Sequence, residues 1–458
     1  MGCCIFGGTH VNRQLIRYIV PNILAMAGTS CYVLADTFFI SIAEGANGIT
    51  ALNLVLPVYG LIYALGSMIG VGSATRYTLS KATGQDSAGD FFSNSVWWTL
   101  LLSSMFVVTG LCFPGEFLAL LGADEQIAAI GVPYLRIVLL FAPFFMLNYT
   151  FTAFVRNDYA PKLAMLATLL SGLFNIVFDY IFMFPMGMGM IGAALATGIS
   201  PIVSMSICMV HYLSKNSSIV FTKKRPSLHK LFASCSLGVV AFVGELSSGI
   251  TTLVFNFILL SISGNTAVAA YGVIANIALV GTALLNGVSL GLQPVASAMH
   301  GRADAKEERR IYAHALIIAE MIAVTAAAAA VLFGDQLIAV FNSERSAELA
   351  SYAAPGIRVY FAGFLIAAVN IIKSGFYSAI GKAAQSSAIA LSRGVITISA
   401  LAFLLSAMFG VMGVWMAFPA SELVTWILSL VMNAVRKTND THIKPHASGE
   451  DADRRDMI

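Results

Sequence analysis

Charged side chains are rare inside the long apolar stretches of this sequence, so each one is a candidate for function. A charged group at the centre of a membrane helix costs roughly 2.5–3.5 kcal/mol on insertion scales, and it therefore needs a partner, a water-filled cavity or a functional role. The charged residues in these stretches are Asp36, Asp179, Glu245, Glu320, Lys373 and Glu422. Glu320 and Glu422 are interpreted as packing or cavity residues, and the others have neighbours that suggest ion chemistry.

Asp36 and Asp179 have neighbours that suit the binding of a positive ion. Tyr32 lies one helical turn before Asp36, and Asn175 lies one turn before Asp179, so each pair shares a helix face. Polar groups on two further helices are Asn148 and Thr197. Two carboxylates buried together would take up a proton or a cation, because burial and like charge both favour neutralisation. In the alternative, Asp36 ends its helix in an aqueous vestibule and Asp179 only accepts hydrogen bonds from hydroxyl groups.

The second half of the chain carries a pair of opposite charges, Glu245 and Lys373, on two apolar segments. We expect either an ion pair between them or a role for Glu245 in contacting cationic substrates in a cavity. If they form a pair, removing either partner would leave an uncompensated charge that costs about 3–5 kcal/mol.

A proline interrupts the first apolar stretch. Pro21 removes one backbone hydrogen bond and crowds the preceding turn, so a bend is expected there. The bend is either a hinge that moves when Asp36 takes up an ion or a static kink, since proline is common in membrane helices.

Composition and hydropathy predict the elements that position these side chains. Of 458 residues, 58% are hydrophobic and 11% are charged, whereas a soluble domain has roughly 25% charged residues. Apolar stretches that could cross a membrane lie at 14–41, 49–75, 92–113, 131–155, 163–184, 190–213, 233–262, 267–298, 311–333, 355–380, 386–408 and 412–435. Backbone groups in lipid must satisfy their own hydrogen bonds, so these stretches predict an all-α membrane protein with about twelve transmembrane helices.

Lys and Arg residues indicate the orientation of the chain. Most fall in the N-terminus, in every second connection and in the tail, whereas the opposite loops contain only Arg345. By the positive-inside rule, both termini are expected in the cytoplasm. The predicted parts are a cytoplasmic N-terminus (1–13), a first lobe (14–213), a basic cytoplasmic linker (214–232), a second lobe (233–435) and a cytoplasmic polar tail (436–458).

The two halves of the chain resemble each other. A proline followed three residues later by an arginine opens the fourth stretch at 133–136 and recurs in the tenth at 355–358. The same spacing relates Asn148 to Asn370. Because each half contains six helices, the repeats are parallel and related by an axis along the membrane normal, which predicts two homologous lobes around a central cavity.

Several segments resemble those of the multidrug and toxic compound extrusion (MATE) family. They are 71–76, 154–165, 172–182, 192–197 and 409–415. The resemblance extends over nearly the whole chain except its first residues and the polar tail, and it implies a MATE-like fold.

The resemblance also implies roles for particular residues. In this family, a cation site in the first lobe uses an Asp on helix one, an Asn and an Asp on helix five, and a Thr on helix six. The matching residues here are Asp36, Asn175, Asp179 and Thr197, and the family's tyrosine and kinking proline match Tyr32 and Pro21. Relatives that bind sodium in the second lobe have an acid on helix ten, where this chain has Lys373, so sodium binding in that lobe is not expected.

The expected function is secondary antiport in the cell membrane. Entry of a proton or a sodium ion would drive export of amphipathic, often cationic organic compounds by a monomer in the lipid bilayer. No cofactor and no nucleic-acid partner are expected, and the one metal considered is Na⁺ at the first-lobe site. The sequence has no Walker sequence, nucleophile elbow or HExxH motif, which argues against an ATP-driven pump and against an enzyme. The alternative is a flippase for lipid-linked sugars, for which the acidic Asp36, Asp179 and Glu245 are unsuited.

Overall fold

Helices account for nearly all of the computed structural model, which describes residues 4–84, 88–120, 125–215, 217–341 and 346–442. The helices are α1 (Cys4–Ala82), α2 (Ala88–Cys112), α3 (Pro114–Leu120), α4 (Glu125–Asn157), α5 (Pro161–Met183), α6 (Gly189–Tyr212), α7 (Leu228–Gly301), α8 (Ala305–Leu332), α9 (Gly334–Phe341), α10 (Ala347–Ala379), α11 (Ala383–Leu391), the π-helix η1 (Ser392–Ile396), α12 (Thr397–Phe409) and α13 (Val411–His442). They contain 12 segments long and apolar enough to cross a membrane, in agreement with the prediction. Most of the polar tail lies outside the described residues.

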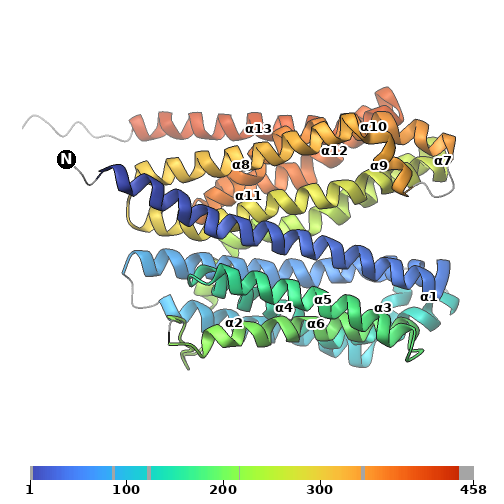
Figure 1. Cartoon of the computed structure of the whole chain (residues 1–458), viewed down its shortest axis with the longest axis horizontal. Helices are drawn as coiled ribbons and strands as arrows, with labels where there is room; N and C mark the ends of the chain where they lie inside the picture. The colour runs from blue at the N-terminus through green and yellow to red at the C-terminus, as the bar shows by residue number, and fades with distance from the viewer. Residues whose placement is uncertain (1–3, 85–87, 121–124, 216, 342–345, 443–458) are drawn as a thin grey trace, which may run out of the picture.

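The longest helices, α1 and α7, each contain two membrane segments. Those of α1 are Arg13–Glu44 and Leu54–Ala82, which run in opposite directions across the molecule (Figure 1). Those of α7 are Leu228–Gly264 and Thr266–Gly301. They join at Gly264, whose φ of 71° suits glycine because glycine lacks a Cβ.

Two lobes lie side by side (Figure 1). The buried core of the first lobe contains Ile62 and Leu135, and that of the second contains Phe255 and Trp415. The start of α1 is an exception to this division, because Leu15 belongs to the core of the second lobe. The first membrane segment therefore contacts both lobes.

Glycines allow the lobes to approach closely near the end that carries the chain termini. A Cβ on Gly238 of α7 would collide with the carbonyl group of Met68, and one on Gly291 would lie 2.6 Å from Cα of Ile19. Further along α7, a Cβ on Gly249 would have no neighbour within 4 Å. The lobes are thus tightly joined near the termini, whereas further away a Cβ on Gly60 of α1 would lie 3.9 Å from Cδ2 of Leu246 of α7.

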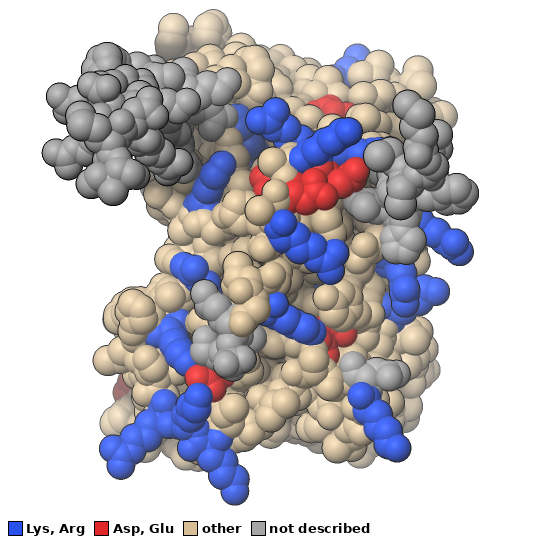
Figure 2. All heavy atoms as spheres, turned by 90° about the vertical axis from the view of Figure 1, so that its left-hand side faces the viewer, with Lys and Arg blue, Asp and Glu red and all other residues tan. Residues whose placement is uncertain are grey.

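The start of α1 and the end of α13 lie at the same end of the helix bundle (Figure 1). Lys and Arg side chains gather on this end and outnumber the visible Asp and Glu (Figure 2). We call this end the basic face. It also carries the described residues of the linker between α6 and α7, 213–215 and 217–227; the sequence placed residues 228–232 in this linker, but they form the first turns of α7.

Candidate cation site in the first lobe

Close packing between the first segment of α1 and α5 brings two polar helix faces together. A Cβ on Gly28 would collide with the side chain of Leu169, and one on Gly172 would lie 3.0 Å from Cδ1 of Tyr32. Residues three and four positions apart share a helix face. Asp36 lies one turn after Tyr32 and therefore faces α5 as well.

The carboxyl groups of Asp36 and Asp179 lie within hydrogen-bonding reach of each other, which is the first of the two arrangements considered from the sequence. Asp179 is fully buried, whereas Asp36 keeps partial exposure. Apart from the neighbouring carboxyl group, no donor among the described residues reaches either oxygen of Asp179. Two carboxylates this close repel each other when both are ionised, so the pair favours uptake of a proton or a cation.

An amide and a hydroxyl group form a polar contact between α5 and α6, one helical turn before Asp179. Asn175 is buried on the same face of α5 as Asp179, and its Nδ2 donates to Oγ1 of Thr197 at 3.1 Å. Oδ1 of Asn175 is buried, and none of the described residues donates to it. Oxygen acceptors without competing donors suit a hard cation such as sodium as well as a proton.

Several tyrosines lie near the acid pair or near Glu245, and the sequence analysis identified only Tyr32 among them. Tyr59 and Tyr134 lie within electrostatic range of both acids, and their hydroxyl oxygens are 3.4 Å apart. The rings of Tyr63 and Tyr149 are 6.0 Å apart. The spacing of Tyr59 and Tyr63 by one helical turn was a signal in the sequence that could have predicted a shared polar face.

Glu245 contacts the first lobe instead of Lys373. The hydroxyl group of Tyr149 donates to Oε1 of Glu245 at 2.9 Å, and Tyr32 lies within electrostatic range of the same carboxylate. Lys373 donates to Oγ of Ser429 at 2.7 Å inside the second lobe. The ion pair considered between Glu245 and Lys373 is therefore not formed in this structure, because α7 carries Glu245 towards α4.

Neither Asn148 nor Pro21 is among the described residues that interact with the acid pair. Oδ1 of Asn148 is buried and accepts from no donor in the described part of the chain, and its share in a cation site stays a prediction. Pro21 is buried within α1, which continues through it as a helix. Next to it, a Cβ on Gly287 of α7 would lie 2.7 Å from Cα of Ile23. The proline thus sits where α1 is held against α7, and its movement as a hinge stays a prediction.

The sequence profile of the MatE family matches residues 21–181 and 241–404, one segment in each lobe. This chain belongs to the MatE family. The match spans the acid pair in the first lobe and Glu245 in the second. It confirms the family expected from the sequence.

Similar proteins agree with this assignment. The transporter is 26% identical over 437 residues to the multidrug export protein MepA of Staphylococcus aureus, covering 94% of this chain and 95% of that protein. Its fold matches the outward-facing conformation of a multidrug resistance MATE transporter of the MOP superfamily with a TM-score of 0.87 and 22% identity, covering 95% and 99% of the two chains. It also matches a MOP superfamily transporter from Pyrococcus furiosus, described as having a binding pocket of reversed polarity, with a TM-score of 0.85 and 23% identity over 93% and 96% of the chains.

The second lobe of this MATE transporter contains a buried ion pair that the sequence did not predict. Arg393 donates to Glu422 through Nη2 at 2.6 Å and through Nε at 3.0 Å. Nδ2 of Asn370 donates to the same carboxylate at 2.7 Å, so Asn370 belongs to this cluster. Arg393 lies in the π-helix η1, an irregularity that hydropathy does not reveal. The charge of Glu422 is therefore compensated by Arg393 inside the lobe, so it requires no water-filled cavity.

A second missed cluster lies at the basic face, around Asp158 after α4. Its carboxylate accepts hydrogen bonds from Tyr77 at 3.0 Å, Lys81 at 3.0 Å and the backbone N–H of Ser218 at 2.9 Å, and lies 3.0 Å from Nε2 of His211. Burial alone would raise the pKa of Asp158, but the bonds from Ser218, His211 and Lys81 outweigh burial and lower it to about 2. This cluster joins the linker to the ends of α1, α4 and α6.

Proposed function

We propose that this MATE transporter is a secondary antiporter that exports amphipathic or cationic organic compounds in exchange for protons or sodium ions. The observation that carries the proposal is the buried contact between Asp36 and Asp179, in which no other donor among the described residues reaches either oxygen of Asp179. Membership of the MatE family and the similarity to a multidrug export protein support the direction and the cargo. The basic face would lie in the cytoplasm by the positive-inside rule, with the chain in the cell membrane.

The acid pair would act as the coupling element. Asp36 keeps partial exposure and offers a route by which an ion reaches the fully buried Asp179. Uptake of a positive charge removes the repulsion between the carboxylates, and the packing of α1 on α5 at Gly172 transmits a change at Asp36 to the rest of the segment. An ion can shift the balance between two arrangements of the lobes only by its difference in affinity for them. The coupling therefore requires that the pair separates or gains water in the other arrangement.

Glu245 would contact the positive charge of a cationic cargo. Its carboxylate lies at the junction of the two lobes, where it accepts from the hydroxyl group of Tyr149 and lies within electrostatic range of Tyr32. A cation over a tyrosine ring gains roughly 0.5–2 kcal/mol, and a nearby carboxylate adds to this attraction. Aromatic surfaces and one acid recognise amphipathic cations without demanding a single shape.

Efflux from proteoliposomes tests the proposal, with a pH gradient and a sodium gradient imposed separately. The wild-type transporter should move a fluorescent cationic dye in response to at least one gradient. Asp36→Asn and Asp179→Asn should each reduce that response to the level of vesicles without protein. Asp335→Asn, which removes an exposed carboxylate from α9, is the matched control and should keep wild-type efflux.

Two results would contradict the proposal. Normal ion-driven efflux by Asp36→Asn would remove the acid pair from the coupling step. Flux that follows neither gradient in the wild-type protein would reject antiport and would favour the alternative of a lipid-linked sugar flippase.

A further inference from the structure

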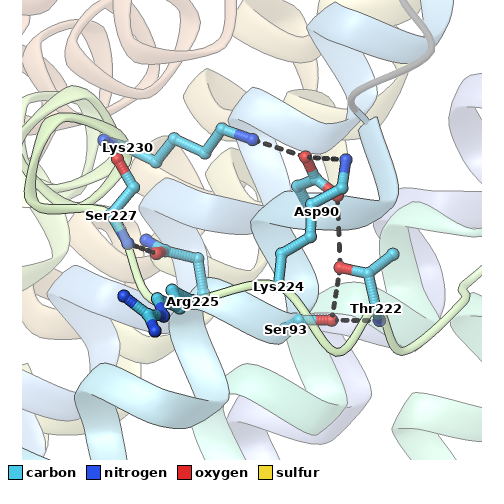
Figure 3. Close-up of a pocket in the computed structure, with 8 residues that line it drawn as sticks. Asp90, Ser93, Thr222, Lys224, Arg225, Ser227 and Lys230 are labelled. Atoms are coloured by element: carbon cyan, nitrogen blue, oxygen red, sulfur yellow. Dashed lines mark hydrogen bonds and ion pairs between the residues drawn. The ribbon is translucent and has the colours of Figure 1, made fainter.

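The linker between α6 and α7 is held against the first turns of α2 and encloses a small pocket at the basic face (Figure 3). The residues that line it are Asp90, Ser93, Asn94, Thr222, Lys224, Arg225, Ser227 and Lys230. The pocket measures about 50 Å³. Sites for drug-sized molecules measure roughly 300–1,000 Å³, so this one suits a single small charged group.

Asp90 fixes the shape of the pocket. Its Oδ2 accepts from Nζ of Lys224 at 3.0 Å and from Nζ of Lys230 at 2.6 Å (Figure 3). Its Oδ1 accepts from Oγ1 of Thr222 at 3.1 Å, and Oδ1 of Asn94 accepts from the N–H of Ser227 at 2.6 Å. The linker therefore presents a defined set of side chains.

Positive charge exceeds negative charge in this pocket. Asp90 is the one carboxylate among its lining residues, and it is shared by Lys224 and Lys230. Arg225 also lines the pocket, is exposed, and makes none of the ion pairs formed by the described residues. Its guanidinium group lies away from Asp90 in Figure 3. An anion could thus bind without displacing the bonds of Asp90.

Apolar side chains around the pocket point to a lipid source for this anion. Val220 and Phe221 precede the basic residues and are exposed, and Leu228 and Phe232 follow them and are exposed as well. The ring of Trp97, also exposed, lies 6.4 Å from that of Phe221. Basic groups beside exposed aliphatic and aromatic side chains are the arrangement expected where a protein meets lipid headgroups.

We propose that this pocket binds the phosphate group of an anionic phospholipid, with Arg225 as its main donor. A guanidinium group suits phosphate because its planar N–H groups bond two oxygens at once. Lys224 and the hydroxyl group of Ser227 lie in the same pocket and supply further donors, while the acyl chains lie against the exposed apolar residues. Binding holds α2 and the start of α7 to the same membrane surface.

Lipid binding to the purified full-length transporter tests this inference. The protein is placed in nanodiscs of phosphatidylcholine with rising fractions of phosphatidylglycerol, and bound phosphatidylglycerol is measured by native mass spectrometry. Arg225→Ala should weaken the binding about fivefold, and Arg225→Glu should weaken it further. Arg309→Ala and Arg309→Glu, at an exposed arginine in the first turns of α8, are the matched controls and should bind as the wild type does.

A competition experiment separates the two sources of phosphate. Glycerol phosphate at millimolar concentration should not displace the lipid, because it lacks the acyl chains. Displacement of bound phosphatidylglycerol by millimolar glycerol phosphate would overturn the assignment to lipid and would favour a soluble phosphate. Unchanged phosphatidylglycerol binding in Arg225→Glu, or an equal loss in Arg309→Glu, would overturn the site itself. The assay measures binding without transport, so its outcome is independent of the antiport test.

Discussion

Arg393 and Glu422 form an ion pair of 2.6 Å inside the second lobe, at a place where the first lobe has two serines. The spacing that relates Asn148 to Asn370 also relates Ser171 to Arg393 and Ser200 to Glu422. In the first lobe, Oγ of Ser171 donates to the backbone oxygen of Ser200 at 2.5 Å. One helix contact is thus made by neutral groups in one lobe and by opposite charges in the other. The ion pair compensates the buried acid of the second lobe, whereas no basic side chain among the described residues pairs with the acids of the first lobe.

Breaking this ion pair should destabilise the transporter. Arg393→Met leaves the buried carboxylate of Glu422 uncompensated, which costs about 3–5 kcal/mol. Thermal unfolding in detergent should show a clearly lower midpoint, and the double variant Arg393→Met/Glu422→Leu should recover much of the loss. Arg309→Met is the surface control. A double variant as unstable as the single one would show that packing at η1, rather than charge, determines the effect.

Filling the glycine contact between the lobes should open the basic face. In Gly238→Ala the new methyl group meets the carbonyl group of Met68, and such overpacking costs about 1–3 kcal/mol. We expect faster maleimide labelling of the nearby Cys235, read by mass spectrometry of its peptide. Gly249→Ala adds the same methyl group where no atom lies within 4 Å and should label as the wild type does. Equal labelling in both variants would contradict closure at this contact.

Removing the charge of Glu245 should discriminate between cargoes. Glu245→Gln keeps a side chain that can accept from Tyr149 but loses the attraction for a cation, so the concentration of a cationic dye for half-maximal efflux should rise about tenfold. A neutral amphipathic substrate should be exported as before. Tyr149→Phe removes the hydrogen bond and tests whether the position of Glu245 matters in addition to its charge. An equal defect for neutral and cationic compounds would assign Glu245 a structural role.

The cluster around Asp158 predicts loss of stability in acid. The folded protein holds the pKa of Asp158 at about 2, below the ordinary value of 3.8. The resulting stabilisation of about 2 kcal/mol is present above pH 4 and is lost as the pH falls towards 2, where the folded carboxylate takes up a proton. Unfolding midpoints measured across this range should fall more steeply for the wild type than for Asp158→Asn. Parallel curves for the two proteins would reject this role of Asp158.

The sequence by itself determined where the membrane helices lie and which acidic side chains they contain. Hydropathy sufficed to find the 12 membrane segments, because each must be apolar over its whole length to lie in lipid. The pairing of Asn175 with Asp179 on one helix face followed from the helical repeat, which is a local property. The sequence left open whether Asp36 and Asp179 meet, and the family resemblance favoured the arrangement in which they do.

Only the tertiary structure decided which side chains meet across helices. Opposite charge suggested a bond between Glu245 and Lys373, but in the folded chain Glu245 accepts a hydrogen bond from Tyr149 of α4, and Lys373 donates to Ser429. The partner of Glu422 depended on the π-helix at Arg393, which shifts the register of one turn without changing composition. Hydropathy reports how apolar a segment is, whereas the rotation and depth of a helix come from packing against its neighbours.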